Sequence, residues 1–192
     1  KAPHRWHLLR NYGYFGRHEK DSKPKMWPHD GSVRSKTSAA YQHMIHKYIR
    51  CVAAIDENIK RVLDYLEEEG VKDETLIIYT SDQGYWLGQH GLYDKRLLLE
   101  ESVKMPLIVR YPGSIKAGTV NEELVSNVDF APTLLEFAGI KADSRMQGRS
   151  IAPLLAGRTP ADWRQAIWYA YGAAGHPHWG MRSKRYKLVL FP

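Results

Sequence analysis

The longest regular pattern in the chain is a repeat of apolar residues at intervals of three and four positions between Tyr41 and Leu66. Charged residues fill the positions between them, so the apolar side chains would share one face of an α-helix. Ser38 or Thr37 can cap the start of this helix, and Gly70 stands where a left-handed residue commonly ends one. The pattern therefore predicts a long amphipathic helix.

The segment before this helix, residues 11–36, shows neither the period of a helix nor that of a strand. It is polar and rich in Lys, His, Gly and Pro, with scattered aromatic residues. Such a composition predicts a long irregular excursion. Loops of this length within a compact domain are usually functional or disordered.

Two short apolar runs indicate strands. Thr75–Thr80 is β-branched and apolar, and it is too short for a helix. A run of this kind is typical of a strand that is buried on both faces of a parallel sheet. Pro106–Arg110 is a second such run, and the predicted helix leads directly into the first. The chain is therefore predicted to be an α/β protein with a mixed, largely parallel sheet flanked by helices.

Shorter helices are predicted after the first strand. Leu97–Ser102 and Ser150–Leu155 are candidates for short helices, and Asn127–Gly139 indicates a capped amphipathic helix that ends at a glycine. Asp129 lies in the first turn of that helix, where the helix dipole stabilises a carboxylate. This position explains Asp129 without a catalytic role.

Near its end the sequence becomes aromatic and strand-like. Ala166–Tyr171 and Tyr186–Phe191 predict strands, and Ser183–Arg185 lies where a hairpin turn is expected. We therefore predict two regions along the chain. The larger α/β part covers residues 1–162, and the start of a small antiparallel subdomain covers residues 163–192.

The 192 residues carry a formal net charge of +7, with an isoelectric point near 9.4. This excess favours anionic partners, but charge alone does not separate nucleic acid, a membrane surface and a sulfated sugar. A single cysteine excludes an internal disulfide framework. The sequence contains no apolar run of about 18 residues, the length that spans a bilayer, and no signal peptide at its start. Because it opens at Lys1 rather than at methionine, we expect a processed or truncated product.

The strand Thr75–Thr80 ends at polar residues that suit a bound ion. Asp82 and Gln83 supply a carboxylate and an amide oxygen at the carboxyl end of the strand, the edge where open α/β sheets bind ligands. Glycines in the following loop allow it to turn tightly, and Lys95 returns a cation to the same neighbourhood. An acid, an amide oxygen and an ammonium group in one loop suit a metal ion that holds an anionic substrate.

The residues Ser81–Arg96 resemble the second signature block of the type I sulfatases, a family of the alkaline-phosphatase-like superfamily. In that family the Asp of the block and its neighbour ligate a divalent metal, usually calcium, and the Lys thirteen positions on contacts the sulfate. The resemblance implies that Asp82 and Gln83 hold Ca²⁺ or Mg²⁺ and that Lys95 is a catalytic and substrate-binding residue. The family more often has His or Asn in place of Gln83. The similarity extends to two further segments, Glu100–Ser102 and Pro106–Val109.

The beginning of the chain resembles another part of the same family. Lys1-Ala2-Pro3-His4 is similar to the family's Lys-x-Pro-His segment, whose His contacts the sulfate ester and can protonate the leaving alcohol. The resemblance implies substrate binding by Lys1 and His4 and general-acid catalysis by His4. Taken alone, His4 would be an exposed histidine in a basic tail. His178 could reach the substrate from the C-terminal region; the alternative is a loop residue without chemistry.

The type I sulfatases use a formylglycine made from a cysteine that precedes Pro or Ala by two positions and Arg by four. Cys51 precedes Ala53, but Ile55 stands where the Arg is needed. We therefore interpret Cys51 as a structural thiol. The resemblance implies that the formylglycine and two further Asp ligands lie upstream of His4. The chain would then be the C-terminal part of a sulfatase, with an incomplete core, and would be inactive without the missing N-terminal part.

The sequence thus predicts a sulfuric ester hydrolase that acts on a sulfated carbohydrate or another sulfate ester, with Ca²⁺ or Mg²⁺ as cofactor. We expect no nucleic-acid partner, and the family implies a periplasmic, secreted or lysosomal location. One alternative is a phosphonate or phosphate monoester hydrolase of the same superfamily, which the upstream nucleophile would distinguish. Another is a non-catalytic basic module that binds polyanions. It would need basic residues on one face, whereas acids alternate with them along the predicted helix.

Overall fold

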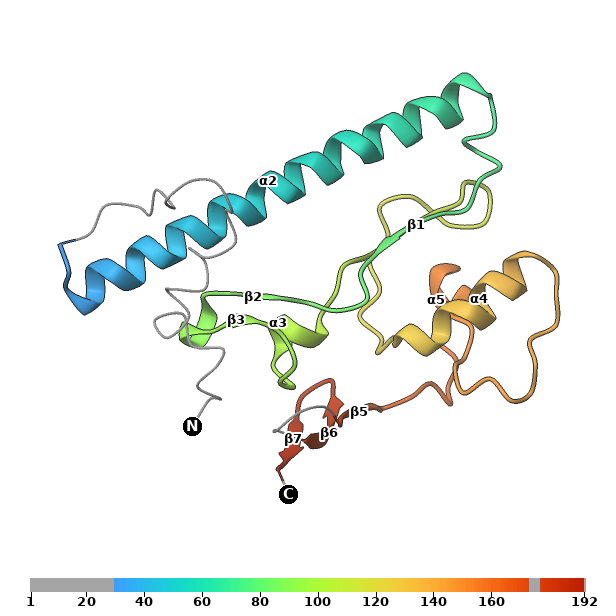
Figure 1. The fold of residues 1–192 in the computed structure, drawn as a ribbon. Helices are drawn as coiled ribbons and strands as arrows, with labels where there is room; N and C mark the ends of the chain where they lie inside the picture. The colour runs from blue at the N-terminus through green and yellow to red at the C-terminus, as the bar shows by residue number, and fades with distance from the viewer. Residues whose placement is uncertain (1–29, 173–176, 192) are drawn as a thin grey trace. The chain divides into compact units, whose positions relative to one another are not determined.

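The computed structural model describes residues 30–172 and 177–191 (Figure 1). The predicted site residues Lys1 and His4 lie outside the described residues, as does most of the predicted excursion over residues 11–36. The chain divides into two compact units, and each is described by itself. The first unit is Lys1–Lys72 with Gly84–Arg96, and the second unit is Asp73–Gln83 with Leu97–Pro192.

The first unit contains one long helix, α2, over Val33–Glu68. Ser32 caps this helix, because the Ser35 N–H donates to the Ser32 side-chain oxygen at 3.2 Å. The cap predicted at Ser38 or Thr37 is therefore wrong. The polar first turns lack the apolar period, yet they are helical, and the Thr37 hydroxyl donates to the carbonyl four residues earlier at 2.8 Å.

The predicted end of α2 is confirmed. Gly70 follows the helix with a φ of 69°, the left-handed conformation that favours glycine. Ala39, Ala40 and Met44 are buried in α2, and Met44 packs against Tyr93. The other apolar residues of the predicted face are half-buried or exposed within the described part of the chain. None of the described helices is both long enough and apolar enough to cross a membrane.

The first unit also holds a small hairpin that the sequence pattern does not predict. Strands β2 over Trp86–Leu87 and β3 over Tyr93–Asp94 pair antiparallel. A 3-10 turn, η2 over Gln89–Gly91, connects them. Trp86 is fully buried and Tyr93 nearly so. These two aromatic side chains anchor the hairpin.

The second unit contains both predicted core strands, β1 over Ile77–Thr80 and β4 over Leu107–Arg110. They pair with each other in antiparallel fashion, with Thr80 opposite Leu107. The largely parallel sheet is not confirmed, since every strand pair among the described residues is antiparallel. Burial of the first strand on both faces is also wrong for the described chain, because Tyr79 is 42% exposed. An apolar run indicates a strand but does not specify the direction of its neighbour, since that neighbour lies far away in the sequence.

The predicted short helices are present in the second unit, with shifted bounds. The helical segments are α3 over Glu100–Val103, η3 over Asn127–Asp129, α4 over Phe130–Phe137 and α5 over Ala152–Leu155. Gly139 follows α4 with a φ of 69°, as the sequence predicts. Ile151, Leu154 and Trp163 form a buried apolar cluster beside them. This cluster is the core of the second unit around α5.

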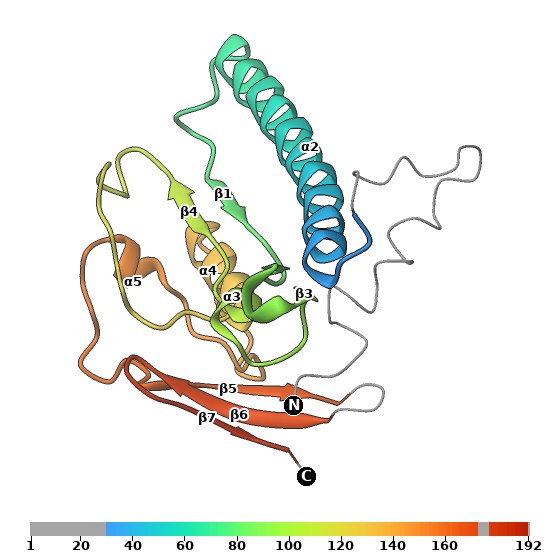
Figure 2. The same cartoon turned by 90° about the vertical axis from the view of Figure 1, so that its left-hand side faces the viewer.

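A three-stranded antiparallel sheet ends the chain, with β6 in its centre (Figure 2). Its strands are β5 over Ala166–Tyr171, β6 over His178–Ser183 and β7 over Lys187–Leu190. The predicted strands and hairpin turn are confirmed, whereas the sequence pattern does not predict β6. Gly180 lets β6 pack closely, because an added Cβ would lie 2.3 Å from the Leu188 carbonyl oxygen. Both predicted regions contribute to the second unit, so the boundary after residue 162 stays a prediction.

Candidate functional site

The two predicted metal ligands lie in the second unit, directly after the carboxyl end of β1. Asp82 and Gln83 are both exposed there. Ser81 organises the turn, because its hydroxyl donates to the Gln83 carbonyl oxygen at 2.8 Å and lies 3.4 Å from Asp82 Oδ1. The chain therefore presents a carboxylate and a carboxamide next to each other at the end of a strand.

This pair fits a hard divalent cation in kind but not in number. Carboxylate and amide oxygens are the donors that Ca²⁺ prefers, but Ca²⁺ takes about 6–8 oxygen ligands. Within the described ranges, no group of three or more His, Cys, Asp or Glu residues is arranged to hold a metal ion. Asp82 and Gln83 can thus supply part of a calcium site, and the remaining ligands would have to come from elsewhere.

The glycine-rich loop that follows belongs to the first unit. Gly88 has a φ of 104° and Gly91 a φ of 69°, so both adopt conformations that favour glycine. The Gly88 N–H donates to the Leu92 carbonyl at 2.9 Å, and the Leu92 N–H donates to the Gln89 carbonyl at 2.9 Å. Leu92 is buried. Hydrogen bonds and one buried side chain therefore fix a loop that would otherwise be flexible.

Lys95 follows this hairpin and is held on two sides. Its Nζ lies 3.4 Å from Asp94 Oδ1 and 5.9 Å from the centre of the Tyr85 ring. Asp94 also forms an ion pair with the Arg96 guanidinium. The Lys95 side chain is 30% exposed, so its ammonium group remains accessible. The loop thus places one carboxylate between two cations, which leaves a net positive charge.

The backbone on both sides of Lys95 is strained. Asp94 has a φ of 81° and Arg96 a φ of 109°, although neither is glycine. Such conformations cost on the order of 1–3 kcal/mol each and cluster at functional sites. Sequence reasoning did not select Asp94 and Arg96. The signal that could have found them is three consecutive charged residues directly after a glycine-rich turn.

The predicted site residues of the described chain therefore belong to different units. Asp82 and Gln83 lie together in the second unit, whereas Lys95 belongs to the first unit. Lys1 and His4 lie outside the described residues. The metal, catalytic and substrate-binding roles of these five residues stay predictions.

His178 is the first residue of β6 rather than part of a loop, and it is fully buried. Its ring lies between three aromatic rings, with centroid distances of 5.4 Å to Tyr171, 5.6 Å to Tyr169 and 5.2 Å to Phe191. Burial raises the pKa of the Tyr169 hydroxyl, and the neighbouring Tyr171 adds to the effect. The aromatic cluster holds His178 in one place, and its predicted contact with substrate is untested.

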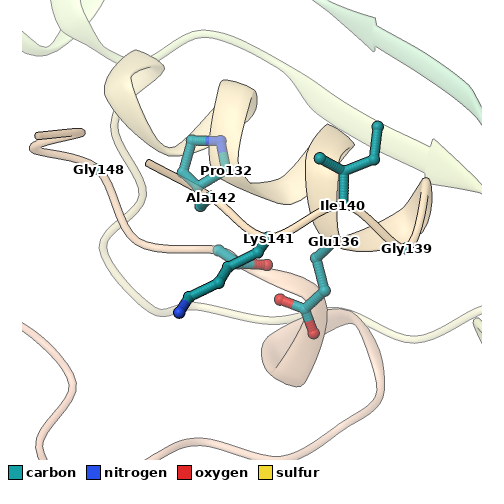
Figure 3. Close-up of a pocket in the computed structure, with 8 residues that line it drawn as sticks. Pro132, Glu136, Gly139, Ile140, Lys141, Ala142 and Gly148 are labelled. Carbon is teal, nitrogen blue, oxygen red and sulfur yellow. The ribbon is translucent and has the colours of Figure 1, made fainter. Parts of the chain in front are cut away.

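A surface hollow lies at the end of α4 (Figure 3). None of the predicted site residues in the described part of the chain belongs to its lining. Its volume is about 500 Å³. Glu136 and Lys141 bring one negative and one positive charge to its wall, beside Pro132 and Gly148. Gly148 is required there, because an added Cβ would overlap the Val128 carbonyl oxygen. The hollow has no concentration of charge or of reactive groups.

Comparison with known proteins identifies the class of this fold. A protein solved in complex with its substrate, D-glucosamine-2-N,6-O-disulfate, is 46% identical, with a TM-score of 0.82 over 84% of this chain and 34% of its own. A phosphonate monoester hydrolase from Silicibacter pomeroyi is 27% identical, with a TM-score of 0.69 over 97% of this chain and 39% of its own. The described α/β fold is thus that of the sulfatases and their alkaline-phosphatase-like relatives.

Sequence comparison then gives the family. Residues 88–192 match the family described as N-sulphoglucosamine sulphohydrolase, C-terminal. An N-acetylglucosamine-6-O-sulfatase of Bacteroides thetaiotaomicron is 48% identical over 170 residues, and the match covers 84% of this chain and 30% of that protein. The chain belongs to this sulfatase family and corresponds to its C-terminal part, as the sequence resemblance implied. It spans about a third of the length of this sulfatase and of the protein solved with D-glucosamine-2-N,6-O-disulfate.

Proposed function

We propose that the protein is a sulfuric ester hydrolase that removes sulfate from a sulfated carbohydrate, most closely a 6-O-sulfated glucosamine. The observation that carries this proposal is the 48% identity to an N-acetylglucosamine-6-O-sulfatase over 84% of the chain. The complex of the 46% identical protein with D-glucosamine-2-N,6-O-disulfate supports the same substrate class. Because the chain spans about a third of these proteins, the activity belongs to the whole protein.

The roles of the described residues follow from the charge of the substrate. A sulfate ester is anionic, so its cleavage requires positive charge at the sulfuryl oxygens. Asp82 and Gln83 would hold a divalent cation, Ca²⁺ or Mg²⁺, which supplies such charge when bound. Lys95 would add a fixed ammonium at the same group, an electrostatic contribution that strengthens in the transition state. Asp94 and Arg96 would position Lys95 through their ion pairs and strained backbone.

The remaining chemistry is assigned to residues outside the described ranges. His4 would deliver a proton to the leaving alcohol, a role that suits a histidine because its pKa lies near neutrality. Lys1 would bind the sulfate beside it. Cys51 is exposed in the middle of α2, and Ile55 occupies the position where maturation needs Arg. The proposed formylglycine nucleophile would therefore lie upstream of these residues. The family resemblance implies that the whole enzyme is periplasmic, secreted or lysosomal.

A phosphonate monoester hydrolase is the second candidate function. The observation in its favour is the fold similarity to the Silicibacter pomeroyi enzyme, which covers 97% of this chain. Its identity of 27% is much lower than the 46% and 48% of the matches named above. The sulfatase is therefore preferred. A non-catalytic module that binds polyanions through α2 is not preferred, because Lys60 of α2 pairs with Asp64 at 2.5 Å rather than contributing to a basic stripe.

The test is turnover by the full-length protein. D-glucosamine-6-sulfate and a phenyl phosphonate monoester are offered separately, and released sulfate or phenol is measured. We expect sulfate release that is lost on chelation of divalent metal, and a fall in kcat of about 100-fold or more for Lys95→Ala, because an electrostatic group at the transferred oxygens is removed. Lys104→Ala removes the same charge from an exposed position and should be silent. Phosphonate cleavage without sulfate release would favour the second candidate.

A further inference from the structure

The turn between β6 and β7 concentrates positive charge. The six residues from 182 to 187 include four cations, Arg182, Lys184, Arg185 and Lys187. Ser183 closes the turn, because its N–H donates to the Tyr186 carbonyl at 2.8 Å and its hydroxyl accepts from the Tyr186 N–H at 2.9 Å. The Arg182 guanidinium also donates to the Ser183 carbonyl, so backbone, hydroxyl and guanidinium groups together close the turn.

One carboxylate serves two of these cations. Arg182 and Lys187 lie directly opposite each other on β6 and β7, an arrangement of like charges that is destabilising by itself. Glu100 of α3 lies between them, with its Oε2 3.1 Å from the Arg182 guanidinium and its Oε1 2.7 Å from the Lys187 ammonium. Sharing one negative charge between two positive ones orients both cations and leaves an excess of positive charge.

Arg185 has no such partner. Lys184 pairs with Glu123 at 2.8 Å, whereas Arg185 has no ion pair with any carboxylate in the described part of the chain. Its guanidinium lies instead 5.1 Å from the centre of the Tyr186 ring. That ring is 68% exposed. An arginine held on an exposed aromatic ring presents a planar set of donors, the geometry that binds sulfate or carboxylate groups with two parallel hydrogen bonds.

These side chains surround a hollow of about 340 Å³, which lies at the lower end of the range of about 300–1,000 Å³ for ligand sites. It is lined by Glu100, Arg182, Ser183, Arg185, Tyr186 and Lys187. We propose that the β6–β7 turn is a binding site for an anionic group of a sulfated glycan chain. Arg185 binds the anionic group together with Arg182 and Lys187, the two cations that share Glu100. The Tyr186 ring lies against the sugar that carries this group.

The choice of ligand rests on the proposed function, because a sulfatase of this family meets sulfated sugars. The form of the site agrees with that choice. A nucleic-acid surface with about 6–10 phosphate contacts or a membrane-binding cluster of about 4–8 basic residues needs more available cations than this turn offers. Three of its four cations pair with Glu100 or Glu123. A single small hollow with one unpaired arginine, two cations that share a carboxylate and an exposed aromatic ring suits one anionic sugar unit instead.

The test is direct binding to the full-length protein, measured by titration calorimetry in low salt. The probes are a heparin-derived tetrasaccharide and the same tetrasaccharide after chemical desulfation, which keeps only its carboxylates. We expect Arg185→Ala to weaken binding of the sulfated tetrasaccharide about tenfold, the loss of one charge-assisted contact. The matched control is Arg145→Ala, since the Arg145 side chain carries the same charge, is 89% exposed and pairs with Asp143 in a loop. It should bind as the unchanged protein does.

Each outcome decides the proposal. Loss confined to Arg185→Ala supports it, and the desulfated probe then shows whether sulfate or carboxylate is recognised. Equal affinities for Arg185→Ala and Arg145→Ala overturn it, as does tighter binding of a DNA oligonucleotide or of phosphatidylserine vesicles at the same turn. Sulfate release from D-glucosamine-6-sulfate is measured in parallel on the unchanged protein. A failure there counts against the proposed function, whereas the binding titration reports on the turn by itself.

Discussion

Asp129 shows at the scale of one residue how hydrogen bonds and an ion pair can satisfy a buried carboxylate. It is fully buried and accepts the N–H groups of Ser126 and Arg149 at 2.8 Å each. The Arg164 guanidinium donates to both of its oxygens, at 2.5 and 2.6 Å. Sequence reasoning explained Asp129 as a helix-start carboxylate, and the capping box with Ser126 confirms that reading. The pairing with Arg164 could not be predicted, because the two residues lie 35 positions apart.

We predict that Asp129→Asn destabilises the protein by about 3 kcal/mol, measured by urea unfolding. Loss of one partner leaves a largely buried guanidinium without a counter-charge, and breaking such pairs costs about 3–5 kcal/mol; Arg164 retains 21% exposure, which favours the lower value. The matched control is Asp143→Asn, which breaks a solvent-exposed pair with Arg145. Equal stabilities of the two variants would contradict the assignment.

At the scale of elements, Glu100 connects α3 to the β6–β7 hairpin. Hydrogen bonds from Arg182 and then the contact with Lys187 lower the pKa of the Glu100 carboxyl from the ordinary 4.5 to about 2. A lowered pKa means that the contact stabilises the fold above pH 4.5 and that this contribution is lost as the pH falls toward about 2. We therefore expect Glu100→Gln to be less stable at pH 7, by on the order of 1 kcal/mol because Glu100 is partly exposed. The difference should shrink as the pH falls from 4.5 to 2.

Thermal unfolding at pH 7, 4.5 and 3 measures this difference. Glu122→Gln is the control, because Glu122 is exposed and this substitution removes the same charge from the second unit. A stability difference for Glu100→Gln that is as large at pH 3 as at pH 7 would show that the side chain acts through packing rather than through its ion pairs.

The elements also show what a sequence pattern can and cannot specify. α2 was predicted because its period of three to four extends over more than twenty residues. Strands β2 and β3 have two residues each, too few to show any alternation. β6 reads His-Trp-Gly-Met-Arg-Ser and lacks the β-branched residues that indicate strands. The antiparallel pairing of β1 with β4 depends on contacts between distant segments, which no local pattern records.

At the scale of the whole molecule, the sequence predicts only part of the candidate site, again because local patterns do not record contacts between distant segments. Asp82, Gln83 and Lys95 were selected from a local block of sequence, and local geometry supports the first two as neighbours and the third as a fixed cation. The strained residues beside Lys95 carry ordinary side chains, and only their backbone angles reveal them. A complete active site gathers residues from distant parts of a chain. This chain spans about a third of the length of the two similar sulfatase-family proteins named above, so the rest of such a site would lie outside it.

The last prediction follows from counting the groups that catalysis needs. The 192-residue polypeptide alone should not release sulfate from D-glucosamine-6-sulfate, whereas the full-length enzyme should. Its one cysteine has Ile55 where formylglycine formation needs Arg, and Asp82 with a neutral Gln83 should hold Ca²⁺ only weakly. Lys95 and His4 can attract a sulfate and supply a proton, but neither replaces a nucleophile. Sulfate release by the purified polypeptide, abolished by chelation and retained in Cys51→Ser, would show that the nucleophile lies within these residues and has been misassigned.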